Sequence, residues 1–240
     1  MAIGWLLSLT DLSVERDAEQ QRVVLLRFLS HDLRAPHSAI LALLDIQSHQ
    51  APGDSQVFKQ IELQVRRALS LTEAFVQLAK AESEAYQFEP SIFAMLILDA
   101  FDQAITIAQL KNVQLVHDLD EEAEGMVSAD QSLLTRALFN LLENAIKYSP
   151  AGSRITVHMS CIEGWLSCEI ADQGKGIAAD ELPRLFSQYQ RFASAQGSDG
   201  LGLGLSMVKA VVDRHGGRIF CESMVGQGTT FSLQLPLLEE

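Results

Sequence analysis

The chain has 240 residues, of which 48% are hydrophobic, and this is enough for one or two domains with separate cores. Its 31 acidic and 18 basic side chains give a formal net charge of -13. This charge excludes nucleic acid as an expected partner, because a phosphate backbone would repel the chain. The 3 cysteines lack metal-ligand spacing, which indicates reduced thiols and a cytoplasmic location.

The first half of the chain has the periodicity of long helices. Residues 12–22 are polar, and from Leu26 to Leu43 apolar residues recur at alternate steps of three and four, the spacing of a coiled-coil seam. Pro36 kinks this helix, and a turn at 51–55 separates it from a second helix with the same rhythm. The apolar stripe of the second helix is too wide for one partner. We therefore predict that two such hairpins form a four-helix bundle, which makes the protein a homodimer.

One histidine of the first helix, His31, lies opposite the apolar seam, with Asp32 beside it. Its ring must therefore face solvent or a partner. The apolar run at 3–7 is too short to span a membrane, so we expect no membrane contact by this segment. A membrane anchor upstream in a longer parent protein stays open.

The second half of the chain mixes helices and strands. Glu163 and Gly164 predict a tight turn between two strands, and the last two strands form another hairpin. Because helices and strands do not alternate strictly, the pattern indicates an α+β sandwich. The predicted helices are 92–110, 132–148 and 207–215, and the predicted strands are 113–119, 154–160, 165–171, 218–224 and 229–235.

The predicted helix 132–148 carries polar residues on one face, namely Asn140, Asn144, Lys147 and Tyr148. The apolar residues between them point mostly into the core. Neutral amide oxygens can ligate Mg²⁺ without repelling a triphosphate, and a lysine can meet the charge of the phosphates. An ordinary amphipathic helix is the alternative.

A second polar motif, the turn 172–177, follows a predicted strand and contains Asp172, Gly174 and Gly176 before Ile177. Paired glycines let the backbone turn sharply and approach a planar ring closely. The carboxylate can accept a hydrogen bond from an exocyclic amine such as that of adenine. An ordinary loop is the alternative.

A third motif, the glycine-rich stretch Gly200 to Gly204, runs into the predicted helix 207–215. Glycines at a helix N-terminus expose backbone amides and the positive end of the helix dipole, which attract anions. The stretch lacks the lysine of a Walker-type loop and the strand context of a dinucleotide-binding motif. Residues 178–199, which precede it, have the composition of a lid hinged at glycines. Together the three motifs indicate a nucleotide site, from which the exposed His31 would receive a phosphate.

In their order, these motifs resemble the boxes of a sensor histidine kinase catalytic core over residues 20–238. Residues 31–36 resemble the phosphoacceptor box, 140–148 the N box, 172–177 and 200–204 two glycine boxes, 186–192 the lid box and 226–229 the last box. The resemblance implies an α+β architecture, in which a dimeric four-helix bundle precedes an α/β sandwich of the Bergerat type.

The resemblance also divides the chain into three parts. Residues 1–22 resemble the end of an upstream sensor domain and a signalling helix in a longer parent chain, with a frayed chain terminus as the alternative. Residues 23–85 would be the dimerisation and histidine phosphotransfer hairpin, and residues 86–240 the catalytic ATP-binding domain.

Residue roles follow from the same resemblance. His31 would accept the γ-phosphoryl group of ATP, and Asp32 would fix the ring tautomer and take the ring proton. Asn144 would hold Mg²⁺, and Asp172 would accept a hydrogen bond from the adenine amine. The residues that the resemblance assigns to ATP are Asn140, Asn144, Lys147, Tyr148, Asp172, Gly174, Gly176, Ile177, Gly200, Leu201, Gly202, Leu203, Gly204 and Thr229.

A response-regulator receiver domain is the partner that the resemblance implies. Ala35 stands four residues after His31, where many relatives carry a threonine or asparagine that orients water, so we predict weak phosphatase activity toward the receiver. Hydrolases of the gyrase or chaperone type carry a glutamate at the position of Asn140, and an amide cannot activate water as a base. A second alternative is a pseudokinase, a dimeric scaffold that binds nucleotide and signals through its helices.

Overall fold

A computed structural model of the chain describes residues 36, 38–40, 42–43, 46, 55–82, 86–119, 125–187 and 202–238. The chain divides into two compact units, Met1–Glu73 and Ala74–Glu240, and the helix α3 (Ser55–Glu82) crosses the division. The predicted residues 1–22, His31 and Asp32 lie outside the described residues, so their predicted roles stay predictions.

The helix α3 confirms the second helix that the sequence predicts. One residue of its apolar seam is open to solvent in a single chain, because Val65 is 40% exposed. Leu71 and Leu78, which flank the predicted seam, are buried. Pro36 is helical and buried, as expected for a proline within the first helix.

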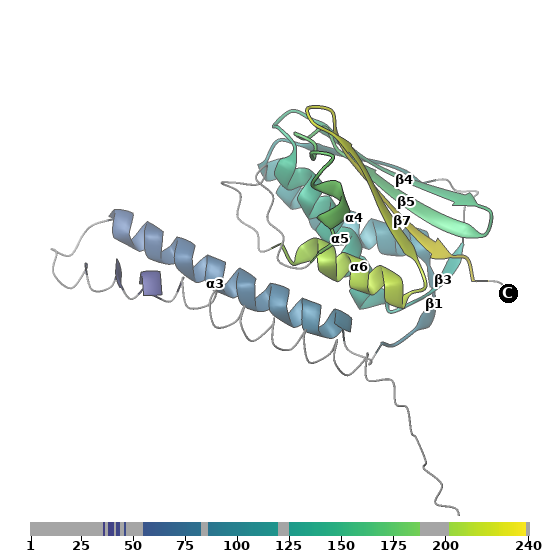
Figure 1. The fold of residues 1–240 in the computed structure, drawn as a ribbon, viewed down its shortest axis with the longest axis horizontal. Helices are drawn as coiled ribbons and strands as arrows, with labels where there is room; N and C mark the ends of the chain where they lie inside the picture. The colour runs from purple at the N-terminus through teal and green to yellow at the C-terminus, as the bar shows by residue number, and fades with distance from the viewer. Residues whose placement is uncertain are drawn as a thin grey trace, which may run out of the picture. The chain divides into compact units, whose positions relative to one another are not determined.

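The described residues of the unit from Ala74 to Glu240 form two sheets (Figure 1). The larger has five strands in the order β2-β4-β5-β7-β6, with β2 parallel to β4 and the other pairs antiparallel. β1 and β3 form a separate two-stranded sheet. The elements are β1 (Glu89–Ile92), α4 (Phe93–Leu110), β2 (Gln114–Leu119), β3 (Met126–Ala129), α5 (Gln131–Tyr148), β4 (Arg154–Ile162), β5 (Trp165–Ala171), η2 (Leu182–Arg184), α6 (Gly204–Arg214), β6 (Arg218–Met224) and β7 (Gly228–Pro236).

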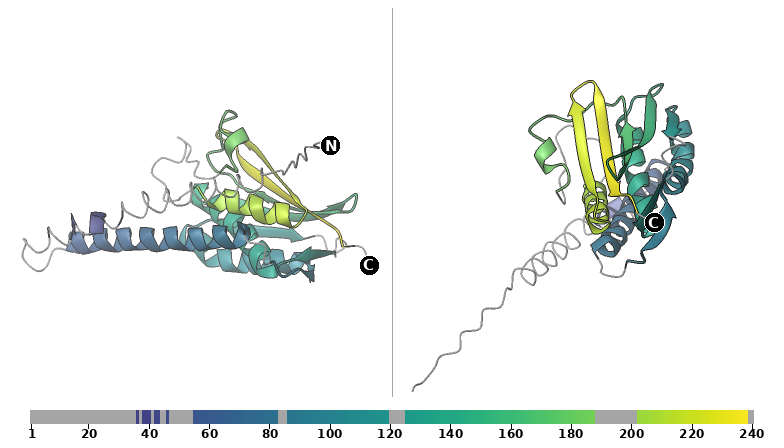
Figure 2. Two further views of the ribbon diagram at one scale, coloured as in Figure 1. Left: turned by 60° about the horizontal axis from the view of Figure 1, so that its bottom comes forward. Right: turned by 90° about the vertical axis from the view of Figure 1, so that its right-hand side faces the viewer.

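The helices α4, α5 and α6 lie on one face of the larger sheet, which makes this unit a two-layer α/β sandwich (Figure 2). Side chains alternate along β4, where Ile155, Val157 and Met159 point to the helices and are at most 1% exposed. On α5, Leu134 and Leu138 share one face at helical spacing and are likewise buried. The core therefore lies between the helix layer and one face of the sheet, and the α/β sandwich that the sequence predicts is confirmed.

The helix α4 is long and apolar enough to cross a membrane by length and composition alone. In this fold it is a core helix that packs against α5 and β2. Phe93, Ile97, Ala100 and Ala104 are at most 1% exposed. Its apolar composition is thus explained by burial within the domain.

Most predicted elements of this unit are confirmed, and the exceptions have physical causes. β5 and β6 have the predicted bounds, and both predicted hairpins are antiparallel pairs. α6 begins at Gly204, earlier than predicted, because the carbonyl of Leu203 accepts hydrogen bonds from the amide of Met207 and the hydroxyl of Ser206. β1 and β3 were not predicted, because each is four residues long and is stabilised by pairing with a distant strand.

Candidate nucleotide-binding site

The polar face of α5 forms one wall of the candidate site. Its start is fixed by Asp130, whose carboxylate accepts a hydrogen bond from the amide of Leu133 at 3.1 Å. Asn144, Lys147 and Tyr148 are partly exposed, while the apolar residues beside them are buried, namely Leu141, Leu142, Ala145 and Ile146. The sequence prediction of a polar face on a buried helix is therefore confirmed.

Asn140 is more enclosed than the other polar residues of α5. It is 9% exposed, and its side-chain nitrogen lies 3.9 Å from the sulfur of Met207 on α6. A thioether sulfur is a weak acceptor, so the amide keeps most of its hydrogen-bonding capacity for another group. A nearly buried amide with such a weak partner is suited to a ligand that enters between α5 and α6.

The first turn of α6 lies beside Asn140. A Cβ added at Gly204 would be 4.0 Å from Cγ of Asn140, and Gly202 has a φ of +69°, which favours glycine. The N-cap residue of α6, Leu203, makes no capping hydrogen bond with its side chain. The first amides of α6 and the helix dipole are therefore available to an anion. Gly200 and Leu201, also predicted for this loop, lie outside the described residues.

Asp172 organises a second corner of the site, at the end of β5. Its Oδ1 accepts hydrogen bonds from the amides of Gly174 at 2.7 Å and Thr229 at 3.2 Å. Burial raises the pKa of Asp172 above its ordinary value of 3.8, and these two amide hydrogen bonds oppose the rise. Because two donors occupy Oδ1, Oδ2 is the atom suited to accept a hydrogen bond from an exocyclic amine.

Glycines hold the turn after Asp172 against neighbouring backbone. A Cβ added at Gly176, whose φ is +69°, would lie 2.1 Å from the carbonyl oxygen of Met224. At Gly174 it would lie 2.9 Å from the carbonyl oxygen of Tyr148, and at Gly228 2.0 Å from that of Asp172. The turn is therefore packed between the end of α5 and the β6–β7 hairpin, and only glycine fits these positions.

Two residues that the sequence analysis did not assign belong to the same corner. The Nζ atom of Lys175 lies 5.0 Å from the centre of the Tyr148 ring, and that of Lys147 lies 5.4 Å from it. The hydroxyl of Ser223 accepts a hydrogen bond from the amide of Ile177 at 2.8 Å. The position of Lys175 inside the motif 172–177 was a usable signal. For Ser223 the only signal was its register opposite Thr229 in the last hairpin.

The structure thus brings the predicted residues together in two groups. One is the corner of Tyr148, Asp172, Gly174, Gly176, Ile177 and Thr229, which together with Lys175 and Ser223 we call the base corner. The other is the phosphate wall of Asn140, Asn144, Lys147, Gly202, Leu203 and Gly204. The two groups meet on α5, where Lys147 is next to Tyr148, while Asn140 lies eight residues, or about 12 Å of helix, before Tyr148.

The described residues could bind a metal ion only if a bound ligand supplied part of its coordination. They contain no group of three or more His, Cys, Asp or Glu side chains that could hold a metal ion. Asn144 can supply one neutral amide oxygen. Mg²⁺ keeps several waters and is commonly bound by one or two protein groups together with substrate phosphates. The phosphate wall therefore fits Mg²⁺ that arrives with a nucleotide.

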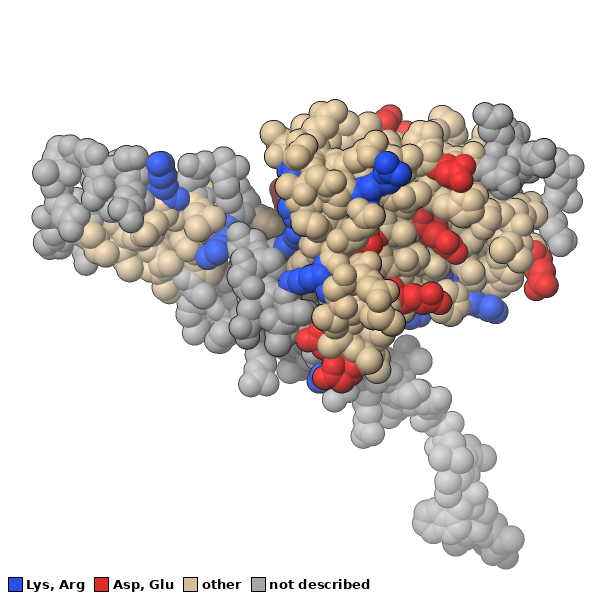
Figure 3. All heavy atoms as spheres, turned by 90° about the horizontal axis from the view of Figure 1, so that it is seen from above, with Lys and Arg blue, Asp and Glu red and all other residues tan. Residues whose placement is uncertain are grey.

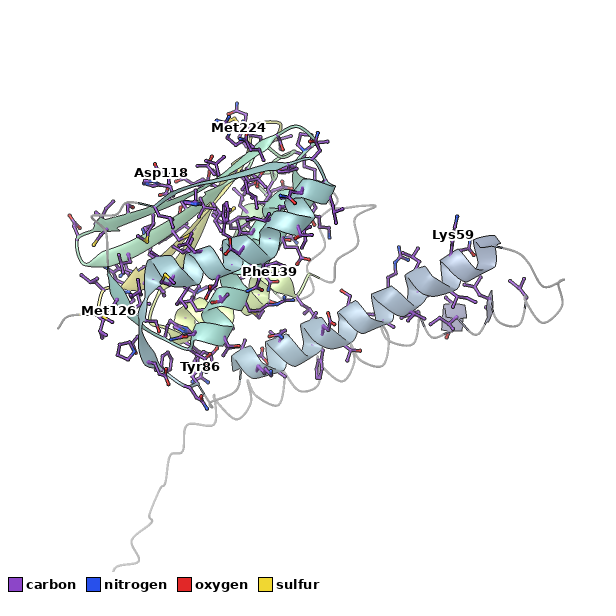
Figure 4. The ribbon with its side chains drawn as sticks, turned by 180° about the vertical axis from the view of Figure 1, so that it is seen from behind. Lys59, Tyr86, Asp118, Met126, Phe139 and Met224 are labelled. Carbon is purple, nitrogen blue, oxygen red and sulfur yellow. The ribbon has the colours of Figure 1, made fainter. Side chains whose placement is uncertain are left out.

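The C-terminal end of α6 lies far from the phosphate wall and packs against the segment that contains Tyr86 and Phe88. Figure 4 shows Tyr86 and Met126 at one end of the domain and Met224 at the other. His215, which follows α6 and is 6% exposed, packs edge-on against Tyr86 and Phe88. Its Nε2 accepts a hydrogen bond from the amide of Asp130 at 3.0 Å, and its Nδ1 lies 2.7 Å from the carbonyl oxygen of Val211. Burial lowers the pKa of His215 below its ordinary value of 6.5.

Charged side chains are mixed on the surface. On the face drawn in Figure 3, basic side chains lie in small groups separated by uncharged surface, and acidic side chains are spread across it. A nucleic-acid partner would need a continuous basic surface. On this face the described residues form none.

Comparison with known proteins places this site in a family. Residues 129–239 match the family described as histidine kinase-, DNA gyrase B-, and HSP90-like ATPases. The chain is 32% identical over 254 residues to the histidine protein kinase DivJ of Caulobacter vibrioides, covering 96% of this chain and 42% of the relative. It is 28% identical over 250 residues to the sensor histidine kinase WalK of Bacillus subtilis, covering 99% of this chain and 40% of the relative.

The fold has solved counterparts as well. The histidine kinase ThkA, in a crystal structure with the response regulator protein TrrA, has a TM-score of 0.75 and is 19% identical, covering 95% of this chain and 68% of that chain. At this identity the likeness concerns the fold. The chain spans about two fifths of the length of DivJ and WalK.

Proposed function

Because this chain carries the catalytic core of a sensor histidine kinase, we propose that it binds ATP and uses it to phosphorylate its own His31. The observation that carries the proposal is the base corner. There, the Asp172 carboxylate is held by two backbone amides with one oxygen left to receive an amine. A carboxylate so placed, next to a wall of amides and a lysine, is suited to a purine base joined to phosphates.

In this proposal the nucleotide is held at both ends. The adenine amine donates a hydrogen bond to Oδ2 of Asp172. The phosphates meet the amide of Asn140, the ammonium of Lys147 and the backbone amides at the start of α6. Asn144 holds Mg²⁺ through its amide oxygen, and the ion supplies charge neutralisation on the phosphates.

The transfer step requires a neutral histidine. A histidine side chain with an ordinary pKa of about 6.5 is mostly neutral at pH 7. One ring nitrogen of His31 attacks the γ-phosphorus, a P–N bond forms, and the P–O bond to ADP breaks. Asp32 accepts the proton from the other ring nitrogen. ADP then leaves, and the domain contributes mainly positioning and charge neutralisation.

Labelling with γ-labelled ATP and Mg²⁺ tests this function. We expect an acid-labile label on the purified chain that is lost in His31→Gln and kept in the control His37→Gln, a histidine without the motif context. Bound ATP without any label would support the pseudokinase. Free phosphate released equally by the native chain and His31→Gln would support a hydrolase. Either result would contradict the proposal.

We also propose that the chain is a homodimer whose phosphorylated histidine passes its phosphoryl group to a response-regulator receiver domain. The exposure of Val65 in the apolar seam of α3 supports a second copy, since this side chain would be covered in a bundle. The solved structure of ThkA is a complex of that kinase with a response regulator protein, and this supports a receiver as partner. Light scattering should give twice the mass of one chain, and a monomer at micromolar concentration would contradict the dimer.

Weak phosphatase activity is part of the same proposal. Ala35 has no polar group to orient a water molecule for attack on the phosphorylated receiver. Incubation of a labelled receiver with this chain and ADP should leave the label in place over many times the transfer half-life. Rapid loss of the label would contradict this part, and Ala35→Thr should increase the loss.

The proposed setting is the cytoplasm, where ATP is available. An upstream sensor domain, in a parent protein that is membrane-anchored or not, would supply the signal. This part of the proposal is supported by the length of the curated relatives, which extend well beyond the matched region.

A further inference from the structure

Ser223, near the end of β6, joins three backbone segments at the base corner. Its Oγ lies 2.8 Å from the amide nitrogen of Ile177 and 2.8 Å from the carbonyl oxygen of Gly228. It also lies 2.9 Å from Oγ1 of Thr229. Ile177 belongs to the turn after β5, while Thr229 is directly opposite Ser223 in the β6–β7 ladder. One hydroxyl therefore ties the turn 172–177 to both strands of the last hairpin.

The direction of each of these hydrogen bonds follows from the partners. A backbone amide can only donate, so Ser223 accepts from Ile177. A carbonyl oxygen can only accept, so the single proton of Ser223 goes to Gly228. Ser223 then has no proton left for Thr229, and the hydroxyl of Thr229 must be the donor in their contact. The Oγ1 atom of Thr229 therefore presents only lone pairs to any other group.

The same corner contains a second acceptor. Oδ1 of Asp172 is occupied by the amides of Gly174 and Thr229, which leaves Oδ2 as a further hydrogen-bond acceptor. A 6-amino purine offers N–H donors at its exocyclic position, whereas a 6-oxo purine offers an oxygen that only accepts. If the oxygen of a 6-oxo purine faced Oδ2 of Asp172 or Oγ1 of Thr229, neither oxygen atom would have a hydrogen-bond donor. An unpaired polar group in a partly buried site costs binding free energy.

We propose that Ser223 is a positioning residue that makes the base corner selective for a 6-amino purine over a 6-oxo purine. It acts through Thr229, whose hydroxyl it holds as an acceptor, and through Ile177, whose turn it holds against the last hairpin. Ser223 does not itself contact the base. This inference rests on the proposed nucleotide binding and adds a specificity determinant to it.

Removal of the Ser223 hydroxyl should have two effects. The amide of Ile177 loses its partner, so the turn that carries Asp172 is less well held and any nucleotide binds more weakly. The hydroxyl of Thr229 becomes free to rotate and can donate its proton to a 6-oxo group. This new hydrogen bond from Thr229 partly offsets the loss of affinity for a 6-oxo purine. A 6-amino purine gains no such hydrogen bond, so its loss of affinity is not offset.

Calorimetric titration with ADP and IDP tests the proposal without phosphoryl transfer. The variants are Ser223→Ala, Ser223→Thr, which keeps a hydroxyl, and Ser232→Ala. Ser232 lies on β7 with its side chain on the opposite face of the sheet, so it is a matched control. If Ser223→Ala does not fold, Ser223→Cys replaces it, because a thiol of similar size is only a weak donor and acceptor.

We expect Ser223→Ala to weaken ADP about tenfold and IDP about twofold, so that the preference for ADP narrows about fivefold. Ser223→Thr should restore most of the preference, and Ser232→Ala should leave both affinities unchanged. Equal losses for ADP and IDP would show a merely structural role and overturn the inference, as would no loss at all. Native chain that binds ADP and IDP equally would also overturn it, whereas native chain that binds neither would overturn the proposed function.

Discussion

The base corner and the phosphate wall are built in different ways. In the base corner, Asp172 and Ser223 already have their hydrogen bonds to the protein before a ligand arrives. In the phosphate wall, the side-chain nitrogen of Asn140 lies 3.9 Å from the sulfur atom of Met207, a weak acceptor. Within the described part of the chain, the side chains of Asn144 and Lys147 form no hydrogen bond. One region is preorganised, and the other keeps its hydrogen-bonding capacity for the ligand.

The two regions should therefore contribute differently to nucleotide affinity and to the rate of phosphoryl transfer. A preorganised corner loses little conformational freedom on binding, so it can select a base at low cost. The phosphate wall must adjust to a group whose charge changes during transfer, so its side chains contribute most when that charge develops. We therefore expect changes in the base corner to alter stability and affinity, and changes in the phosphate wall to alter mainly the rate.

The largest expected effect is in the phosphate wall. Asn144→Ala should lower the rate of His31 labelling about a thousandfold, or about 4 kcal/mol, because a ligand of the metal ion that neutralises the phosphates is lost. The thermal unfolding midpoint should not change, since Asn144 is partly exposed. Glu143→Ala, at the exposed neighbouring position, is the control. If Asn144→Ala lowered the thermal unfolding midpoint and left the labelling rate unchanged, the phosphate wall would contribute to stability and not to rate, which would contradict the expectation.

The next effect concerns the stability of the base corner. Gly176→Ala should lower the free energy of unfolding by about 3 kcal/mol, because its Cβ would lie 2.1 Å from a backbone oxygen at a φ of +69°. Gly164→Ala is a matched control, with a φ of +79° and nothing within 4 Å of the added Cβ. Its cost should be about 1 kcal/mol, from the left-handed backbone alone. Urea unfolding measures both, and equal losses would mean that the turn is not tightly packed.

Asp172 should separate affinity from stability. Asp172→Asn should weaken ADP about hundredfold, or about 2.7 kcal/mol, because the amine of the base loses a charged acceptor. The pKa of Asp172 is raised in the folded state, so the folded protein binds the proton more tightly than the unfolded chain does. The resulting stability is present at low pH and is lost as the pH rises from about 3.8 through the folded pKa. At pH 7 the asparagine variant, which buries no charge, should be as stable as the native chain or more so. A large loss of stability would contradict this.

The smallest effect is expected at His215, which also has its hydrogen bonds within the protein but lies outside the site. Its pKa is lowered on folding, so its contribution to stability is full above pH 6.5 and is lost as the pH falls toward the folded pKa. The urea concentration at the unfolding midpoint should therefore decrease when the pH is lowered from 7 to 5.5. The affinity of the folded protein for ADP should stay constant over the same range. His215→Gln, which cannot titrate, should flatten this dependence. A change in ADP affinity in His215→Gln would contradict this expectation, because it would show that the C-terminal end of α6 is coupled to ligand binding at its N-terminal end.

Much of the fold and about half of the site geometry could be predicted from local pattern. The bounds of β5 and β6, and the burial of Leu141 and Ile146 beneath the polar face of α5, follow from periodicity. The enclosure of Asn140 could not be predicted, because it depends on Met207, which is 67 residues away. The same is true of the hydrogen bond between Ile177 and Ser223, which are 46 residues apart.

Local sequence pattern is enough to predict the mixed α/β character of this unit, the polar face of α5 and the glycines that mark the nucleotide motifs. It could do so because side-chain direction and turn geometry repeat over a few residues. The pairing of β1 with β3, the hydrogen bonds that hold Asp172 and the contacts of Ser223 could be seen only in the folded molecule. These features depend on which distant segments the packed core brings together, and the local periodicity of the sequence contains no information about such contacts.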